Sequence, residues 1–298
     1  MYQPQYMNFS YFIPPQDGWS RNRTVHIQDE SYTLLDQLGQ GKFASVWKSK
    51  TRSGYYAAVK IFDFNHSKNN INSSQRMNSF QNEIKMINRL RNEKDSVVTL
   101  HTFDIDRERQ MGYIVMELGN TKFKDHIQYL QQTHYKSHQN GYDYISAYDR
   151  KNIWIQLVNI VCALHRNNIV HRDLKPANLV FFGSTLKLID FGIAQDVSAQ
   201  YNPHQRGGSH PYSAPECFVY YMPITSKADI WSIGAILYYL TYGTSPVYES
   251  AQPPSGYSPT QSNLVQDILY HSLQRDPNRR AEHRWLVEHP LTKSNAIF

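Results

Sequence analysis

The stretch that decides the fold is HRDLKPANLVFFGSTLKLIDFG, which runs from His171 to Gly192. Two short apolar runs, LVFF and LKLI, are separated by Gly-Ser-Thr and predict two strands joined by a turn. A polar loop before the first strand carries Asp173 and Asn178, and Asp190 follows the second strand directly. The window therefore places two carboxylates and an amide close together. Residues from other segments would have to complete a site around them.

Length and composition are those of an ordinary folded protein. The chain has 298 residues, of which 40% are hydrophobic and 19% are charged, enough for one large domain or two lobes with an apolar core. The net charge of +6 is mild and the basic residues are scattered, so we expect no nucleic-acid partner. No apolar run reaches the roughly 18 residues of a membrane span, so we expect no membrane association.

Cysteine usage and the N-terminal residues favour a protein inside the cell. Cys162 and Cys217 show no paired spacing, which argues against a metal site and against a disulfide framework. The first residues lack the basic and apolar regions of a signal peptide. We therefore expect the protein in the cytoplasm, the nucleus or both. Residues 1–28 are rich in Tyr, Gln, Asn and Pro, which favours a flexible extension over a docking segment.

A glycine-containing turn follows Tyr32. The sequence LLDQLGQGKFASVWKSK and the later YYAAVKIF predict a strand, a glycine loop and two further strands joined by a hairpin. Gly39 and Gly41 have no Cβ and let backbone N–H groups approach a phosphate closely. An ordinary hairpin is the alternative for this loop alone. Lys60, 14 residues after Val46, favours a phosphate site, because a strand lysine in this pattern holds phosphates.

A helix is predicted to bring a carboxylate to this lysine. Apolar residues at helical spacing follow Ser73 and Ser74, and Glu83 lies beside the apolar stripe. We expect Glu83 to turn toward the sheet and pair with Lys60. The alternative is one more exposed glutamate on a helix surface.

The strand MGYIVM is predicted to end at a base-binding segment. Met116 would lie behind the base, and the backbone groups of Glu117 and Leu118 would bond its edge. A buried strand end that holds no ligand is an equally open alternative.

The remaining segments predict a largely helical C-terminal half. Residues 121–132 and 148–167 are expected to be helices, with a loop over 133–147 between them. The helix in ADIWSIGAILYYLTYG is apolar nearly all round and should be buried. Asp229 near its start then needs N–H partners, which we expect from the loop at His171.

The segment between Asp190 and that buried helix is polar and glycine-containing. We expect it to be a mobile loop that ends in Ala214-Pro215-Glu216. Arg280 is a candidate partner for Glu216.

Taken in order from Tyr32 to Leu291, these motifs resemble those of eukaryotic protein kinases of the serine/threonine type. Within that group the chain is similar to the monopolar-spindle or TTK-type dual-specificity kinases. This resemblance rests on NEIKMINRL, VMELGN, LKPAN, LKLIDFGIA and LYYLTYG. The chain also has an arginine, Arg172, in the H-x-D motif and a short stretch between Asp229 and Arg280, both of which differ from the TTK type.

The resemblance implies an α+β, two-lobed fold with a small, mostly antiparallel β lobe plus one helix, and a larger, mostly α lobe. It implies an N-terminal extension over 1–28, an N-lobe over 29–119, a C-lobe over 120–291 and a tail over 292–298. It also implies transfer of the γ-phosphoryl group of Mg²⁺-bound ATP to Ser or Thr, and in a dual-specificity enzyme to Tyr, of protein substrates. A role in mitotic spindle-checkpoint signalling would follow from the TTK type.

Each motif then implies a role. The residues with implied catalytic roles are Asp173, Lys175, Lys60 and Glu83. The implied Mg²⁺ ligands are Asn178 and Asp190, whose oxygens are hard donors. The residues implied to bind ATP are Leu38, Gly39, Gln40, Gly41, Lys42, Phe43, Ala44, Ser45, Val46, Ala58, Lys60, Met116, Glu117 and Leu118. Asp173 would accept the proton of the substrate hydroxyl, Lys175 would steady the γ-phosphate, and Ser209 would bond Asp173.

Arg172 favours regulation by phosphorylation. An arginine beside the base is placed to pair with a phosphorylated loop residue, for which Ser198, Tyr201 and Ser209 are candidates. The competing functions are a pseudokinase scaffold and a small-molecule kinase of similar fold. A scaffold would be expected to lack the lysine, the aspartates or the asparagine, and all are present.

Overall fold

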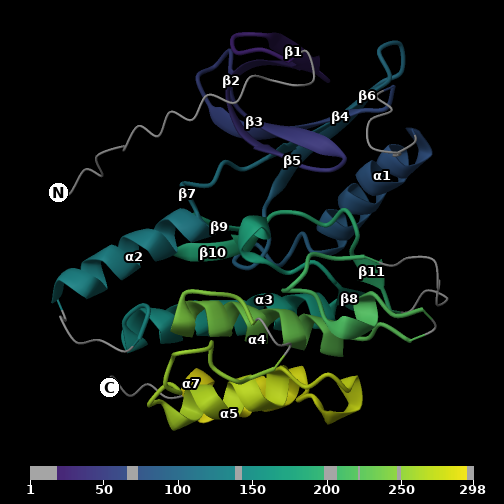
Figure 1. Ribbon diagram of the computed structural model, residues 1–298. Coiled ribbons are helices and arrows are strands. Elements are labelled where there is room, and N and C mark those ends of the chain that lie inside the picture. Colours follow the sequence, from purple (N-terminus) through teal and green to yellow (C-terminus); the bar gives the residue numbers. More distant parts are fainter. Residues whose placement is uncertain are drawn as a thin grey trace.

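The computed structural model describes residues 19–65, 73–137, 143–197, 207–220, 222–246 and 250–293. Strands dominate the N-terminal part and helices dominate the C-terminal part (Figure 1). This arrangement matches the α+β class predicted from the order of strand and helix patterns. Among the described residues, no helix combines the length and apolarity needed to cross a lipid bilayer.

The N-terminal part is built on a six-stranded antiparallel sheet in the order β1-β2-β3-β4-β6-β5. Its strands are β1 (Thr24–Ile27), β2 (Glu30–Gln40), β3 (Ala44–Thr51), β4 (Tyr56–Asp63), β5 (Leu100–Asp106) and β6 (Met111–Met116). The neighbouring strands β4 and β6 are buried along nearly their whole length. Side chains alternate between the two faces of a strand, so this sheet must be covered on both sides.

The outer face of the sheet carries its own apolar cluster. Its buried members are Trp19, Val25, Ile27, Tyr32, Leu34, Trp47, Ala57, Val59, Ile61, Met111, Tyr113 and Val115. Strand β1 pairs with β2 from Thr24↔Thr33 to Ile27↔Glu30, which brings Val25 and Ile27 over this face. The Arg23 guanidinium lies 4.1 Å from the centroid of the Trp19 ring.

The prediction of a flexible extension over residues 1–28 is therefore wrong for residues 19–28. Trp19 and Ile27 are buried, and Thr24–Ile27 form a strand whose short alternating pattern the sequence analysis did not detect. The earlier part of that range, residues 1–18, lies outside the described residues.

Helix α1 (Ser73–Arg89) packs under the inner face of the sheet, as predicted. Phe80 meets Phe62 and Phe64 edge-to-face, with ring centroids 5.3 Å and 5.8 Å apart. Gly112 on β6 is needed beneath these rings, because a Cβ there would lie 2.6 Å from Phe64. Aromatic packing therefore fixes the distance between α1 and the inner face of the sheet.

The C-terminal part consists of helices and two small sheets (Figure 1). Its helices are α2 (Phe123–Ser137), α3 (Ala147–Arg166), α4 (Lys227–Tyr242), α5 (Asn263–Ser272), α6 (His283–Glu288) and α7 (Pro290–Lys293). Its strands are β7 (Thr121–Lys122), β8 (Ile169–Val170), β9 (Leu179–Phe182), β10 (Thr185–Leu188) and β11 (Gln195–Asp196). The sheets are ordered β10-β9-β7 and β11-β8. Strands β9 and β10 lie above α3 and α4 (Figure 1).

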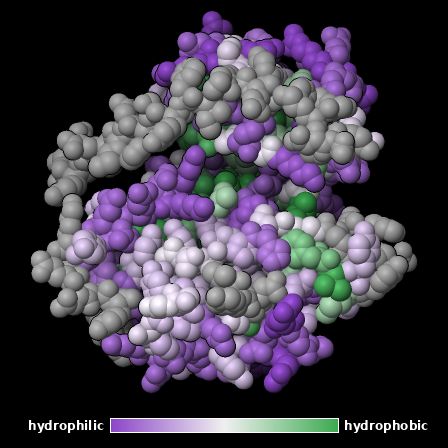
Figure 2. Space-filling view, in the orientation of Figure 1, coloured by the Kyte–Doolittle hydropathy of each residue, from purple (hydrophilic) through white to green (hydrophobic). Residues whose placement is uncertain are grey.

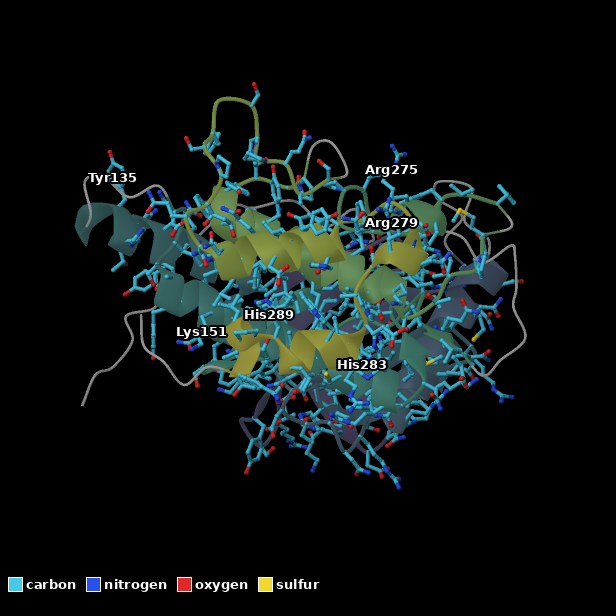
Figure 3. All side chains as sticks on the ribbon, turned by 90° about the horizontal axis from the view of Figure 1, so that it is seen from below. Tyr135, Lys151, Arg275, Arg279, His283 and His289 are labelled. Carbon is cyan, nitrogen blue, oxygen red and sulfur yellow. The ribbon has the colours of Figure 1, made fainter. Side chains whose placement is uncertain are left out.

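Helix α4 forms the centre of this part. All but two of its residues are buried, in agreement with the apolar pattern that predicted a central helix. Gly243 ends the helix with φ 74°, a left-handed conformation that favours glycine, and its N–H bonds to the carbonyl of Tyr239. Seen from below, Arg275 and Arg279 lie together at one end of the helical part (Figure 3). His283 is the first residue of α6, and His289 directly follows this helix.

The expected loop over residues 133–147 is shorter than predicted. Helix α2 continues to Ser137, and the Thr133 hydroxyl donates to the carbonyl of Tyr129 one turn earlier, which accommodates the β-branched residue within the helix. The predicted helix over 148–167 corresponds to α3. Ser146 caps its N-terminus by accepting the N–H of Asp149 at 3.0 Å.

Candidate functional site

Three charged side chains from three elements meet between the sheet and the helices. The Lys60 ammonium on β4 lies 2.7 Å and 2.6 Å from the two Glu83 carboxylate oxygens of α1. It also lies 3.1 Å from Oδ1 of Asp190, which follows β10. The predicted contact between Lys60 and Glu83 is present, and Asp190 joins it.

Burial and charge act in opposite directions on these three groups. Burial disfavours the Lys60 cation, but the neighbouring Asp190 and Glu83 carboxylates outweigh this and raise its pKa. Burial would raise the pKa of Asp190, but Lys60 and the Gly192 N–H lower it to about 2. Burial also dominates at Glu83 and raises its pKa. The site therefore keeps a lysine cation beside an ionised aspartate.

Strand register places five of the predicted nucleotide residues on one face of the sheet. Val46 is opposite Lys60, Ala58 is opposite Met116, and Ala44 lies two positions before Val46 on the same strand. These side chains form the inner face of the sheet. The predicted face therefore assembles from three strands that are separated in the chain.

Ser45 is the exception among these residues. Its side chain lies on the opposite face, where its hydroxyl accepts the Trp47 indole N–H at 3.1 Å in a buried position. Side chains alternate between the two faces of β3, so the Ser45 side chain points away from the predicted nucleotide site. Only the backbone of Ser45 could contact a nucleotide there.

The glycine loop is a tight turn between β2 and β3. The Gly41 N–H bonds to the carbonyl of Ala44 at 2.8 Å, and Gly39, Gln40, Gly41 and Lys42 are exposed. Phe43 is half-buried, and its carbonyl accepts the Arg76 guanidinium of α1 at 2.9 Å. Leu38, on β2, is also half-buried. Sequence analysis did not identify Arg76, whose position in the first turns of a helix carries no motif.

The strand end at Met116 supplies backbone groups, with one difference from the prediction. The Glu117 N–H already donates to the Thr99 carbonyl at 3.0 Å, so at this residue only the carbonyl can bond a base. Within the described part of the chain, the Leu118 backbone groups bond to no other backbone group. Met116 is buried beneath this segment.

The Glu117 side chain ties this segment to the C-terminal part. Its Oε1 accepts the Thr99 N–H at 2.6 Å and the Lys187 ammonium of β10 at 2.7 Å. Burial alone would raise the pKa of Glu117, but these hydrogen bonds lower it below its usual value. Gly119 allows close packing there, since a Cβ would lie 2.2 Å from Val180. Sequence analysis identified neither Lys187 nor Gly119.

The loop before β9 presents one free carboxylate oxygen. Asp173 Oδ2 accepts the Lys175 ammonium at 2.7 Å and the Asn178 amide at 3.2 Å. Asp173 Oδ1 is buried and has no hydrogen-bond partner among the residues that the structure describes. A buried carboxylate oxygen without a donor is costly, so a donor supplied by a ligand would be favourable here.

Ser209 contacts Lys175 rather than Asp173. The Lys175 ammonium donates to the Ser209 hydroxyl at 2.5 Å and to Asp173 as well, so the lysine stands between them. The predicted direct contact between Ser209 and Asp173 is therefore wrong, because Lys175 fills the space between the two oxygens.

Asp229 holds the loop from beneath, as predicted. Its carboxylate accepts the backbone N–H groups of His171 and Arg172, each at 2.9 Å. It also lies 3.2 Å from Nε2 of His165 on α3, a partner that sequence analysis missed. A histidine at the end of an apolar helix gives no signal of its own.

Arg172 lies within the fold rather than on its surface. It is 4% exposed, and its guanidinium donates to the carbonyl of Ile193. Ser198 and Tyr201, two of its candidate phosphorylated partners, lie outside the described residues. Control by loop phosphorylation stays a prediction, and loss of activity on phosphatase treatment is the measurement that checks it.

Glu216 and Arg280 form a buried ion pair on the far side of the loop. Their two pairs of atoms lie 2.6 Å and 2.7 Å apart, and both side chains are fully buried. The guanidinium also lies 5.1 Å from the centroid of the Trp231 ring on α4. This predicted pair fastens the end of the Ala214–Glu216 segment to the helical part.

Asp190 and Asn178 retain oxygens that could hold a cation. Asp190 Oδ1 is bonded to Lys60 and Gly192, whereas Asn178 donates through its nitrogen. That leaves Oδ2 of Asp190 and the amide oxygen of Asn178, both suited to Mg²⁺. The described residues contain no cluster of three or more His, Cys, Asp or Glu ligands, so phosphates and water would have to complete the shell. These residues fit a magnesium ion bound together with a nucleotide.

The site opens into a hollow between the two parts of the molecule. Figure 2 shows this hollow, with apolar side chains along its floor, between the sheet-rich part above and the helical part below. Lys60 comes from the sheet above, whereas Asp173 and Asn178 come from the loop below. A ligand in the hollow would therefore contact both parts.

Comparison with known proteins agrees with this geometry. The family described as "Protein kinase domain" matches residues 32–292. The dual specificity protein kinase TTK of Mus musculus is 27% identical over 299 residues, covering 92% of this chain and 33% of TTK. Calcium/calmodulin-dependent protein kinase type 1 of Caenorhabditis elegans is 30% identical over 305 residues, covering 94% of this chain and 79% of that protein. Serine/threonine-protein kinase MPS1 of Encephalitozoon cuniculi is 27% identical, covering 92% of this chain and 46% of that protein.

The chain spans about a third of the length of the TTK proteins that it matches. The similarity to TTK-type kinases that the sequence motifs indicated is confirmed at the level of these matches. Since the family match covers most of the chain and includes every charged residue of the site, the chain belongs to the protein kinase domain family.

Proposed function

We propose that this protein transfers the γ-phosphoryl group of Mg²⁺-bound ATP to Ser and Thr hydroxyls of protein substrates. The observation that carries the proposal is the unpartnered, buried Oδ1 of Asp173, held beside Lys175 and Asn178. It lacks only a donor, and a substrate hydroxyl is such a donor. The two parts of the molecule would act as two lobes with ATP in the hollow between them.

Each charged residue has a defined task in this reaction. The hydroxyl oxygen bonds to the γ-phosphorus, the bond to the β–γ bridging oxygen breaks, and the hydroxyl proton passes to Asp173. Lys60, oriented by Glu83, bonds the α- and β-phosphates, and Lys175 lies close enough to Asp173 to neutralise charge on the γ-phosphate. Asp190 and Asn178 would hold a magnesium ion, which would supply electrostatic stabilisation of the phosphates.

The expected adenine contacts follow from the backbone at Glu117 and Leu118. These two residues directly follow Met116, which is opposite Ala58 in the sheet. The Glu117 carbonyl would accept from the base and the Leu118 backbone would complete the contact. Val46, opposite Lys60, would cover the base or sugar from the sheet side.

The range of acceptors remains part of the proposal. The names of the TTK relatives state dual specificity, and the name of the Encephalitozoon cuniculi relative states serine/threonine specificity. We propose Ser and Thr as the main acceptors, with Tyr as an additional one. Peptide arrays scored separately for Ser, Thr and Tyr test this directly. A role in spindle-checkpoint signalling is a further proposal, which rests on the resemblance of the sequence motifs to the TTK type.

Incubation with radiolabelled Mg²⁺-ATP and a generic protein acceptor, beside Asp190→Asn and Asp173→Asn, tests the function itself. Each variant should lose about a hundredfold or more in kcat, because a metal ligand or a general base is removed. Equal incorporation by the wild type and both variants would contradict the site. Nucleotide binding without incorporation by any of the three would favour the alternative, a pseudokinase-type scaffold.

A further inference from the structure

The turn that follows Asp190 is held by a side chain of α1 that has no role in the mechanism above. The Asn82 amide nitrogen lies 3.1 Å from the Phe191 carbonyl, 3.4 Å from that of Gly192 and 2.9 Å from that of Ala194. An asparagine amide carries two N–H donors, and here both face a group of carbonyls. The three carbonyls converge on one nitrogen and share its two N–H donors.

The same turn also contacts α1 directly. A Cβ at Gly192 would lie 2.8 Å from the Ser79 hydroxyl, so glycine is needed for the helix to approach so closely. Ser79 lies one turn before Asn82 on the same side of α1. The turn therefore contacts α1 at two residues, Ser79 and Asn82, that lie one helical turn apart.

A second donor on α1 holds the next part of this segment. Arg89, seven residues after Asn82 and on the same side of the helix, donates to the Asp196 carboxylate on β11. It also donates to the carbonyl of Asn167, at the end of α3. Residues 191–196 are thus fastened to α1 at both ends.

Asn82 immediately precedes Glu83, and the turn that it holds immediately follows Asp190. Lys60 contacts both carboxylates, at 2.6 Å and 3.1 Å, which requires α1 and the turn to keep a fixed separation. We infer that Asn82 is a positioning residue, which holds the Asp190 turn against α1 and so keeps both carboxylates within reach of Lys60. This inference rests on the proposed phosphoryl transfer and adds a residue to it.

The test compares Asn82→Asp with Asn88→Asp, an exposed asparagine of the same helix. Aspartate has the same shape as asparagine, but its carboxylate cannot donate to the carbonyls and repels them. Asn82→Asp should lower kcat about 10- to 100-fold with KM for ATP nearly unchanged, because misplacement of the carboxylates leaves the adenine contacts intact. Asn88→Asp should retain the wild-type kcat.

A double-mutant cycle with Glu83→Gln distinguishes positioning from a general structural effect. If Asn82 acts through the placement of Glu83 and Asp190, its replacement should cost much less in the Glu83→Gln background than in the wild type. Equal losses in the two backgrounds would overturn the inference. Should Asn82→Asp unfold at the assay temperature, Asn82→Ala, which removes the donor without adding a charge, takes its place. Wild-type kcat and KM in a folded variant that has lost the donor would also overturn it.

Hydrogen–deuterium exchange gives a readout that does not depend on activity. Amides of residues 190–197 should exchange faster in Asn82→Asp than in the wild type, and those in Asn88→Asp should not. A wild type that transfers no phosphate would refute the proposed function while leaving this comparison valid. Unchanged exchange in Asn82→Asp would refute the role of Asn82 while leaving the proposed function in place.

Discussion

At the scale of single residues, the site depends on charges that would be costly in isolation. Lys60 is almost fully buried, and the fully buried Glu83 and the nearby Asp190 compensate its charge. Glu117 and Lys187 show the same principle outside the catalytic residues, with side chains 23% and 10% exposed. Removing one partner of such a pair leaves the other partly desolvated and unpaired.

Lys187→Met should destabilise the protein by about 1–3 kcal/mol, because Glu117 keeps its burial and loses a charged donor. The aliphatic part of the replacement still packs on Phe182, whose ring lies 4.8 Å from the lysine ammonium. Adding Glu117→Gln should recover part of the loss. Chemical denaturation of the two single variants and the double variant measures this coupling, and Lys122→Met, at an exposed lysine on β7 of the same sheet, is the control. Strictly additive losses would show that the pair is not coupled.

At the scale of elements, close approaches between strands and loops determine where the site residues lie. The segment after β6 packs on β9 at Gly119, where any Cβ would meet Val180 at 2.2 Å. Farther along the chain, the Ala214–Glu216 segment is fastened to the helices by the Glu216–Arg280 pair. Both contacts join parts of the chain that are far apart in sequence.

Gly119→Ala should cost about 1–3 kcal/mol through overpacking against β9. Gly39→Ala, in the glycine loop, should change stability by less than about 0.5 kcal/mol, since no atom lies within 4 Å of a Cβ at that position. Combining Gly119→Ala with Val180→Ala should restore stability, because the clashing methyl group is removed. Thermal unfolding of these variants checks the prediction. Equal melting temperatures for the two glycine variants would contradict it.

Arg280→Leu should destabilise by about 3–5 kcal/mol, because Glu216 would remain fully buried without a counter-charge. Arg279→Leu is the matched control, because Arg279 directly precedes Arg280 and is exposed. Figure 3 shows Arg279 on the underside of the molecule. Pairing Arg280→Leu with Glu216→Gln should reduce the loss. Urea denaturation curves measure all four proteins. Comparable midpoints for Arg280→Leu and Arg279→Leu would show that the buried pair contributes little.

At the scale of the whole molecule, stability should depend on pH through three histidines of the helical part, of which His289 is buried, His126 is half-buried and His283 is exposed. Burial lowers the pKa of His126, His283 and His289 from the ordinary histidine value. A group that binds its proton less readily when folded favours the unfolded chain as pH falls below about 6.5. The raised pKa of Glu83 has the opposite effect on stability as pH falls. The dependence of wild-type stability on pH therefore does not separate the contribution of the histidines.

His126→Asn separates one of these contributions. His126 packs on Phe181, with ring centroids 4.2 Å apart, and burial disfavours its charged form. The wild type should exceed the variant in stability most above pH 7, and this difference should shrink as pH falls through about 6.5 toward 5.5. Melting temperatures across that range measure the difference, with His101→Asn, at an exposed histidine on β5, as the comparison. An NMR titration of His126 that gave a pKa above 6.5 would refute the stated cause.

The sequence by itself determined the chemistry of this site and most of its elements. Lys60, Asp173, Asn178 and Asp190 each lie in a short motif, so their types and spacings could be read without knowing which other residues surround them. The strands of the glycine loop and the buried helix α4 could likewise be predicted, because alternating or continuous apolar patterns are local properties. The predicted Lys60–Glu83 and Glu216–Arg280 contacts were recovered because both partners belong to recognisable motifs.

Only the tertiary structure decided which other residues support these motifs. Asn82 meets carbonyls more than 100 residues away, His165 meets Asp229, and Lys187 meets Glu117. None of them has a local pattern, because such contacts arise when helices and strands pack, and packing depends on the whole chain. Strand β1 was missed for the same reason, since its few alternating residues become a strand only by pairing with β2. Lys175 likewise displaced Ser209 from Asp173, because three side chains compete for one space.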